Sequence, residues 1–194
     1  MLSQVNIQDI VAIAKEAGGA IMKIYKQDFE VEYKQDNSPL TQADKKANNI
    51  IEEGLKRLAV SLPVLSEKGK DAPHKDRKSW EYFWLVDPLD GTKEFVKKNG
   101  EFTVNIALIQ KNTPVLGVVY APELDVCYWE KQGEGAFKDG KAPPFKTKER
   151  RKIYKIVTSR SHMSNETQAF IDAIYTSKEK ELISIGSSLK ICLV

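Results

Sequence analysis

Hydrophobic residues recur at helical spacing near the start of the chain. Over residues 6–26 they stand three or four positions apart, which predicts an amphipathic helix with one buried stripe. A second stripe follows in SPLTQADKKANNIIEEGLKRLA, where Thr41 is placed to cap the helix and Asp44 falls in its first turn. The sequence therefore predicts two consecutive helices, the first of them a scaffold.

The hydrophobic period changes after the second helix, from LPVLSE onward. Runs rich in β-branched and aromatic residues lie between Gly, Pro and Asn turns. The predicted strands are 82–87, 102–110, 114–121 and 126–130. Two helices followed by a meander predict an α+β fold, with helices packed on a largely antiparallel sheet.

A different pattern begins near residue 150. The basic, proline-containing stretch KDGKAPPFKTKERRKIYK interrupts the meander, and alternating elements follow it. They are a strand at 153–158, a helix at 165–175 and a strand at 182–186. We predict an N-terminal subdomain, 1–150, and the start of an α/β subdomain, 151–194. GSSLKICLV begins an apolar element with no turn or cap, so we expect the biological chain to continue past Val194.

The composition mainly excludes certain classes of partner and site. Thirty basic and 27 acidic residues give a net charge of +3, too small for a nucleic-acid coat or a polybasic membrane anchor. No run approaches the ~18 apolar residues that span a bilayer. Cys127 and Cys192 are isolated, which argues against a disulfide framework or a zinc site. We expect a cytoplasmic protein, with a homodimer and peripheral attachment to the inner membrane left open.

The stretch FWLVDPLDGTKEF places two aspartates three positions apart after an apolar run. If Asp87 ends a strand, the following turn could aim the Asp87 and Asp90 carboxylates and the Leu89 carbonyl at one point. Such an all-oxygen set suits Mg²⁺, which would also cancel the repulsion between the two acids. The alternative is a structural Asp-Pro turn with Asp90-Gly91 at its tip.

Gly91 and Thr92 follow the two aspartates and begin a short helical pattern. The first N–H groups of a helix have no partner within it and can bind phosphate, and the Thr92 hydroxyl could orient a water. The alternative is that Thr92 only caps the helix.

Two further acids have weaker signals. Glu67 follows the apolar run PVLS and could complete a metal site, although most loop glutamates are only solvated surface. Asp44 could instead serve as a variant of a capping box with Thr41.

The spacing of the aspartates also separates two mechanisms. Phosphotransferases with an aspartyl nucleophile carry two aspartates separated by one residue, whereas two residues separate Asp87 from Asp90 here. This spacing favours a water nucleophile activated by a metal ion.

Taken together, these residues resemble the lithium-sensitive, Mg²⁺-dependent phosphatases related to inositol monophosphatase and fructose-1,6-bisphosphatase, over the whole chain. WLVDPLDGTKEF is similar to the family signature DPxDGT, and VLSEKG to the strand with a metal-binding Glu. SPLTQAD is similar to the segment whose Asp pairs with the signature Thr. The resemblance implies a layered αβαβα sugar-phosphatase-like fold with an incomplete second subdomain.

Other segments, among them KQDNSPLTQADKKAN and TSRSH, most resemble the bacterial CysQ branch, the 3'(2'),5'-bisphosphate nucleotidases. This implies hydrolysis of the 3'-phosphate of adenosine 3',5'-bisphosphate to AMP, with its sulfated form as a further substrate. The same chemistry on inositol phosphate or fructose bisphosphate is one alternative, and a catalytically inactive phosphate-ester binder is another. The partner is then a small phosphate ester, without nucleic acid or an integral membrane segment.

The resemblance also implies a role for each site residue, with two or three Mg²⁺ ions per site. The metal ligands would be Glu67, Asp87, the Leu89 carbonyl and Asp90. Asp44 and Thr92 would activate water, and the Gly91 and Thr92 amides would hold phosphate. Glu67 and Asp90 would also contact substrate, while His162, Ser187 and Lys190 would bind its other phosphate and sugar. From the residues alone, His162 could equally be a loop histidine, Ser187 an N-cap and Lys190 a solvated helix residue.

The sequence departs from the family pattern in two places. The acid often found after the metal-binding Glu is Lys68 here, a change that we expect to matter little because it lies outside the ligand set. The family's C-terminal Trp-Asp motif, whose Asp completes another metal site, would lie beyond Val194.

Overall fold

The computed structural model describes residues 1–27, 31–33, 39–69, 72–141 and 153–193. The N-terminal elements are η1 (Leu2–Gln4), α1 (Ile7–Tyr25), β1 (Val31–Tyr33), β2 (Pro39–Thr41), α2 (Gln42–Lys56), β3 (Val64–Ser66), α3 (His74–Arg77), β4 (Tyr82–Asp90) and α4 (Thr92–Val96). The remaining elements are β5 (Thr103–Gln110), β6 (Thr113–Ala121), β7 (Val126–Lys131), β8 (Gly135–Lys138), β9 (Ile153–Ser159), α5 (Asn165–Ala173), β10 (Glu179–Ile185) and η2 (Ser188–Leu193).

The first helix forms where the hydrophobic stripe predicts it. Asn6 is its N-cap, and the Asn6 side chain accepts a hydrogen bond of 3.1 Å from the Gln8 N–H, which satisfies one of the donors at the helix start. The buried residues of α1 include Ile10, Ala14 and Ile21, which lie on one face of the helix. The helix thus has one apolar face to bury.

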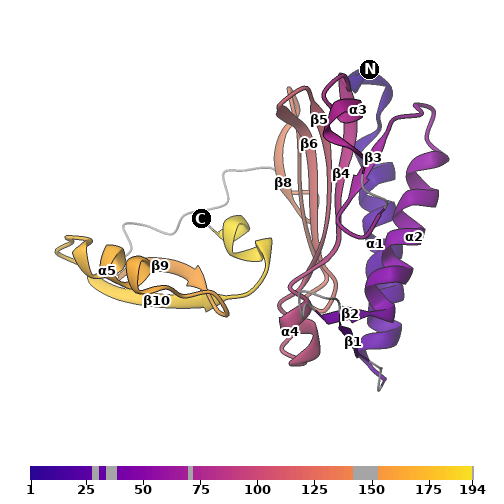
Figure 1. Ribbon diagram of the computed structural model, residues 1–194. Helices are drawn as coiled ribbons and strands as arrows, with labels where there is room; N and C mark the ends of the chain where they lie inside the picture. The colour runs from indigo at the N-terminus through magenta and orange to yellow at the C-terminus, as the bar shows by residue number, and fades with distance from the viewer. Residues whose placement is uncertain (28–30, 34–38, 70–71, 142–152, 194) are drawn as a thin grey trace.

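A six-stranded sheet of order β3-β4-β5-β6-β7-β8 carries these helices. β3 pairs with β4 in parallel, and every other neighbouring pair is antiparallel, as the meander predicted. α1 contacts β5, β6 and β7, and α2 contacts β4, so both helices cover the same sheet (Figure 1). This is the predicted helix layer on a largely antiparallel sheet.

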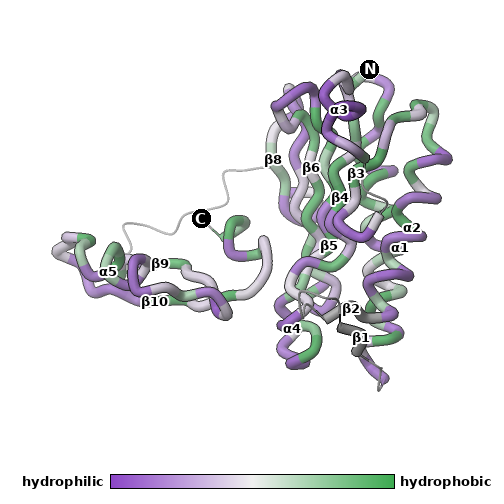
Figure 2. Tube along the Cα trace, viewed as in Figure 1, coloured by the Kyte–Doolittle hydropathy of each residue, from purple (hydrophilic) through white to green (hydrophobic). Residues whose placement is uncertain are grey.

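The space between the helices and the sheet holds the main hydrophobic core. Its largest fully buried side chains are Trp84, Phe95, Phe102, Ile10, Ile21, Ile51, Leu89, Ile106, Leu108, Val104 and Val118. Gly18 lets α1 approach the sheet closely, because a Cβ at this position would lie 2.5 Å from Cε1 of Tyr120. Figure 2 shows hydrophobic residues along the strands of this sheet.

A bulge shapes the end of β4. Asp87 pairs with Asn105 and Asp90 with Thr103, so two residues of β4 oppose one residue of β5 between these pairs. One of the two is Pro88, which has no N–H to donate to the ladder. The expectation that Asp87 ends the strand is therefore wrong: the strand continues to Asp90, and the bulge replaces the expected Asp-Pro turn.

The C-terminal elements form a smaller unit. β9 and β10 pair in parallel, and α5 connects them, which confirms the predicted α/β alternation (Figure 1). The predicted apolar element at the end of the chain is the short helix η2, in which Leu189 is buried and Ile191 is 72% exposed.

The predicted boundaries agree with most elements to within a few residues, while β1, β2, α3 and β8 were not predicted from the sequence. The predicted subdomain boundary near residue 150 lies outside the described residues. Thr41 directly precedes α2, as predicted for its cap, although its side chain also lies outside the description. Among the described helices, none has the length and apolar character to cross a bilayer.

Candidate active site

A cavity of about 320 Å³, the junction cavity, lies where the large sheet meets the smaller unit. Its lining consists of Glu67, Lys68, Asp90, Gly91, Thr92, Lys93, Glu94, Ser159, His162, Gly186, Ser187 and Lys190. Seven of the predicted site residues are among them: Glu67, Asp90, Gly91, Thr92, His162, Ser187 and Lys190. The structure thus gathers residues that stand more than a hundred positions apart in the sequence. Asp44 and Leu89 are buried, and Asp87 is half-buried.

Asp87 lies on the bulged end of β4 in an acidic environment. Burial, together with the nearby Glu67 and Asp90 carboxylates, raises the pKa of Asp87 to about 8, and Asp44 adds to the shift. Asp87 Oδ1 is buried, and it has no hydrogen-bond partner among the described residues. An acceptor in this condition is costly unless a cation or a proton satisfies it.

Asp90 connects the large sheet to the smaller unit. Its Oδ2 accepts a hydrogen bond from the Ser188 N–H and faces the Thr103 hydroxyl and the Asn105 amide, each 3.5 Å away. Ser188 Oγ also contacts Thr103 Oγ1 at 2.9 Å and donates to Asn105 Oδ1 at 3.0 Å. The same carboxylate that is predicted to bind metal therefore also positions the start of η2.

Lys68 lies between two of the predicted site acids. Its Nζ is 2.9 Å from Oε1 of Glu67 and 3.1 Å from Oδ2 of Asp44, and the Lys68 side chain is only 7% exposed. Burial alone would lower the pKa of Lys68, but hydrogen bonds and attraction from the two carboxylates outweigh it and raise the pKa. Lys68 lies outside the predicted ligand set, but its ammonium group pairs with a predicted metal ligand and with the predicted water-activating acid, contacts that the sequence did not predict.

Gly91 shapes the turn into α4. It is the N-cap residue and has a left-handed backbone, with φ 89° and ψ 41°. A Cβ at this position would lie 3.0 Å from the Glu101 carbonyl oxygen. Both the left-handed backbone and this close approach therefore favour glycine. Thr92 is the first helical residue, and its hydroxyl donates to the Leu89 carbonyl at 3.4 Å. The alternative that Thr92 caps the helix is wrong.

The three predicted residues of the smaller unit line the same cavity in different ways. His162 is exposed. Ser187 precedes η2 with a left-handed φ of 51°, and its Oγ accepts from the Leu189 N–H at 3.2 Å, as in the capping alternative. Lys190 is half-buried and donates to the Ser187 carbonyl, so it differs from a fully solvated helix residue.

Sequence reasoning missed the residues that join the two parts of the site. Arg160 donates to both carboxylate oxygens of Glu101, at 2.6 Å each, and the Gly186 N–H donates to the same carboxylate at 2.7 Å. Glu94 is buried, lines the cavity and accepts from the Ser161 hydroxyl. Burial alone would raise the pKa of Glu101, but its bonds with Arg160 and Gly186 hold that pKa below its usual range. No local motif marks these pairs, because their members are distant in sequence.

The chemistry of the acids fits a divalent cation. Glu67, Asp87 and Asp90 supply hard oxygen donors, and the orphaned Asp87 Oδ1 is the atom that such an ion would satisfy. In this conformation, the described residues contain no group of three acids, histidines or cysteines arranged to hold a metal ion. The Glu67 carboxylate lies against the Lys68 ammonium group. Glu67 is 54% exposed and so has room to rotate.

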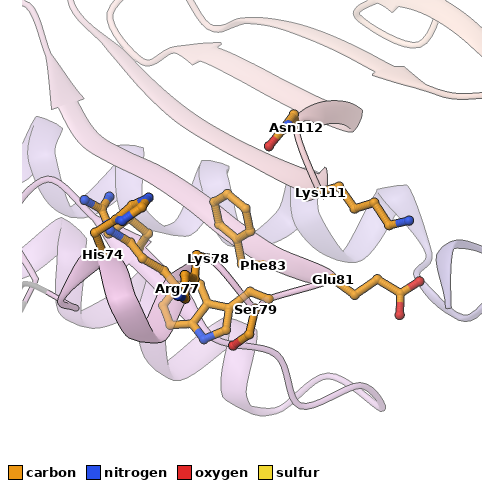
Figure 3. A pocket seen from close by; sticks show the side chains of 10 residues that line it. His74, Arg77, Lys78, Ser79, Glu81, Phe83, Lys111 and Asn112 are labelled. Atoms are coloured by element: carbon orange, nitrogen blue, oxygen red, sulfur yellow. The ribbon is translucent and has the colours of Figure 1, made fainter.

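A larger cavity, of about 680 Å³, lies at the other end of β4 (Figure 3). Phe83, Arg77, Lys78 and Lys111 are among its lining residues. Phe83 is seven positions before Asp90 on β4, which is roughly 20 Å at the rise of a strand. Size alone therefore does not identify the active site, because the predicted site acids Glu67 and Asp90 line the smaller cavity.

Comparisons with known proteins agree with this geometry. The model of the inositol monophosphatase family matches residues 1–194. A 3'(2'),5'-bisphosphate nucleotidase CysQ of Salmonella typhimurium is 46% identical over 192 residues, which cover 97% of this chain and 76% of the relative. The protein of the same name from Escherichia coli K12 is 45% identical over 193 residues, with the same coverage.

A solved structure gives the same result for the fold. The crystal structure of CysQ from Bacteroides thetaiotaomicron, described as a bacterial member of the inositol monophosphatase family, is 40% identical. It superposes with a TM-score of 0.82 and covers 98% of this chain and 76% of that chain. The family match over residues 1–194 and the identity to these relatives lead to one conclusion: this chain belongs to the inositol monophosphatase family.

Proposed function

We propose that this protein is a 3'(2'),5'-bisphosphate nucleotidase that hydrolyses the 3'-phosphate of adenosine 3',5'-bisphosphate to AMP, and the same phosphate of its sulfated form. The observation that supports the proposal is the junction cavity, whose lining includes Glu67 and Asp90 together with His162, Ser187 and Lys190 of the smaller unit. A substrate with two phosphates needs such a second group of polar residues. The CysQ relatives support the same substrate.

The metal in this proposal is Mg²⁺, with two or three ions per site. Glu67, Asp87, the Leu89 carbonyl and Asp90 would hold it, since all four offer oxygen donors near the end of β4. When bound, the ions would neutralise the carboxylates, lower the pKa of water and stabilise charge on the phosphoryl and leaving oxygens.

The protein groups supply orientation and proton transfer. Thr92 and Asp44 would orient the attacking water and take its proton, because they lie on two elements that flank the acidic cluster. The Gly91 and Thr92 amides would hold the phosphoryl oxygens in line with the attacking water. His162, Ser187 and Lys190 would bind the other phosphate and the sugar. Water attack breaks the bond between phosphorus and the 3' oxygen, releasing phosphate and AMP.

A phosphate-release assay tests this function. With Mg²⁺ present, adenosine 3',5'-bisphosphate should be hydrolysed faster than inositol phosphate or fructose bisphosphate, and a chelator should stop the reaction. A higher rate on either of the other esters would replace the proposed substrate. Binding of the nucleotide without any hydrolysis would favour the inactive binder.

The variant Asp90→Asn tests the site. We expect it to abolish phosphate release, because it removes a metal-binding charge, while the fold stays intact, because the amide oxygen can still accept from the Ser188 N–H. Circular dichroism and the melting temperature check the fold. Asp76→Asn is the matched control, since Asp76 lies on α3, away from the junction cavity. Near-normal turnover by Asp90→Asn would contradict the assignment.

A further inference from the structure

Lys68 lines the junction cavity and has no role in the proposed mechanism. It brings a positive charge beside acids of the predicted site, and its side chain is only 7% exposed. A lysine at an exposed position would point its ammonium group into water. Here the ammonium instead lies between Glu67 and Asp44.

The backbone around Lys68 is fixed by a chain of hydrogen bonds to α2. The Lys68 N–H donates to Ser66 Oγ at 3.3 Å, and Ser66 Oγ donates to Asn48 Oδ1 at 2.5 Å. Asn48 is one helical turn after Asp44, and so lies on the same face of α2. The turn after β3 is thereby tied to the helix face that carries Asp44, which places the Lys68 side chain beside that carboxylate.

The two carboxylates depend on Lys68 to different extents. Asp44 is fully buried, and an ionised carboxylate at such a position is strongly destabilising without a positive charge beside it. Glu67 is 54% exposed, so it does not need Lys68 for stability, yet its Oε1 is held 2.9 Å from the ammonium. A divalent cation that uses Glu67 must therefore compete with Lys68.

We propose that Lys68 is a built-in counter-ion of the carboxylate cluster: it holds Glu67 and Asp44 when no divalent cation is bound, and it releases Glu67 when one binds. This inference rests on the proposed function, since it concerns the same site. A bound cation must displace the Lys68 ammonium from Glu67, and it then remains close to the positive charge of that ammonium. Lys68 therefore weakens Mg²⁺ binding and sets the Mg²⁺ concentration at which the site fills.

A titration with Mg²⁺ tests this role without any measurement of activity. The protein is first freed of metal with a chelator, and MgCl₂ is then added while heat is recorded by isothermal titration calorimetry. We expect Lys68→Gln to lower the half-saturating Mg²⁺ concentration about tenfold, because one nearby positive charge is removed. Lys68→Glu should lower it further, and Lys68→Arg should stay close to the wild type.

Lys93→Gln is the matched control, because Lys93 lines the same cavity but is exposed and makes no ion pair with any described residue. It should change the half-saturating concentration less than threefold. If Lys68→Gln binds Mg²⁺ no more tightly than Lys93→Gln, the counter-ion role is wrong. If neither the wild type nor Lys68→Gln binds Mg²⁺, the metal site of the proposed function is wrong as well. If Mg²⁺ binding tightens as expected but no ester is hydrolysed, the counter-ion role stands and the proposed function fails.

A measurement on the unmodified sequence covers the case in which Lys68→Gln does not fold. Acetylation of lysines with an N-hydroxysuccinimide ester can be followed by mass spectrometry of peptides, with and without saturating MgCl₂. We expect Lys68 to react slowly without Mg²⁺ and several-fold faster with it, while Lys93 reacts at a similar rate in both. A Lys68 rate that stays the same or falls when Mg²⁺ is added would overturn the proposed release.

Discussion

The large sheet with α1 and α2 differs from the β9-α5-β10 unit in how it is stabilised. In the first region, side chains such as Trp84, Ile51 and Leu108 are fully buried between the helices and the sheet. In the second, Ile171 is the only buried residue that α5 provides, and Leu182 of β10 is 47% exposed. A two-stranded parallel sheet with one helix gains little from burial, since parallel sheets are normally covered on both faces.

Polar contacts hold the smaller unit against the larger one. Arg160 and the Gly186 N–H bind Glu101, and the Ser188 N–H binds Asp90. Such contacts depend on direction and distance, so they fix orientation more than they add free energy. The comparison shows that the apolar core stabilises the part of the molecule that carries Asp87 and Asp90. A small number of polar contacts orient the part that carries the residues proposed to bind substrate.

The largest expected effect comes from the same substitution made in each region. Leu108→Ala removes a fully buried side chain and should lower the free energy of unfolding by about 2–5 kcal/mol. Leu182→Ala, at a half-exposed position, should cost about 1 kcal/mol or less. Urea unfolding followed by tryptophan fluorescence and circular dichroism measures both. Equal losses would show that the two regions are stabilised in the same way.

An intermediate effect concerns pH and the contact between the two regions. Because the folded pKa of Glu101 is held below the ordinary value of 4.5, its contribution to stability is complete above that value. The contribution is lost as the pH falls through the lowered folded pKa. The Gly186 amide signal in ¹H–¹⁵N NMR spectra should therefore shift at a pH below 4.5.

Two variants sharpen the NMR experiment. Glu101→Gln should remove this titration of the Gly186 signal, and Glu179→Gln, a change at an exposed acid of β10, should leave it in place. An unchanged titration in Glu101→Gln would mean that another group holds the two regions together.

The smallest expected effect comes from the exposed face of α5. Phe170 is 71% exposed, so Phe170→Ser should change the melting temperature by less than about 2 °C while reducing aggregation on heating. Light scattering during the melt measures both. The neighbouring Ile171→Ser is the control, because Ile171 is 7% exposed and a serine there should lower the melting temperature clearly. A large decrease in the melting temperature of Phe170→Ser would show that this face of α5 is packed against another part of the protein.

Periodicity predicted α1, α2 and most strands because each buries one face, and a one-sided burial leaves a regular pattern in the sequence. The DPLDGT stretch predicted a site at Asp87, Asp90 and Gly91 because these residues are close together along the chain. The extension of β4 to Asp90 was missed, because the bulge depends on pairing with β5, which no local pattern records. The ion pair of Lys68 with Asp44 was missed for a similar reason, since Asp44 is 24 positions earlier in the chain.

By itself, the sequence determined the helices α1, α2 and α5, the meander of strands, the acidic motif followed by Gly-Thr, and the resemblance to a phosphatase family. Each of these follows from neighbours along the chain. Only the tertiary structure decided that Lys68 lies between Glu67 and Asp44, and that His162, Ser187 and Lys190 line the same cavity as Asp90. The physical reason is that electrostatic pairing and cavity formation depend on distances in space, which folding sets between residues that the sequence keeps far apart.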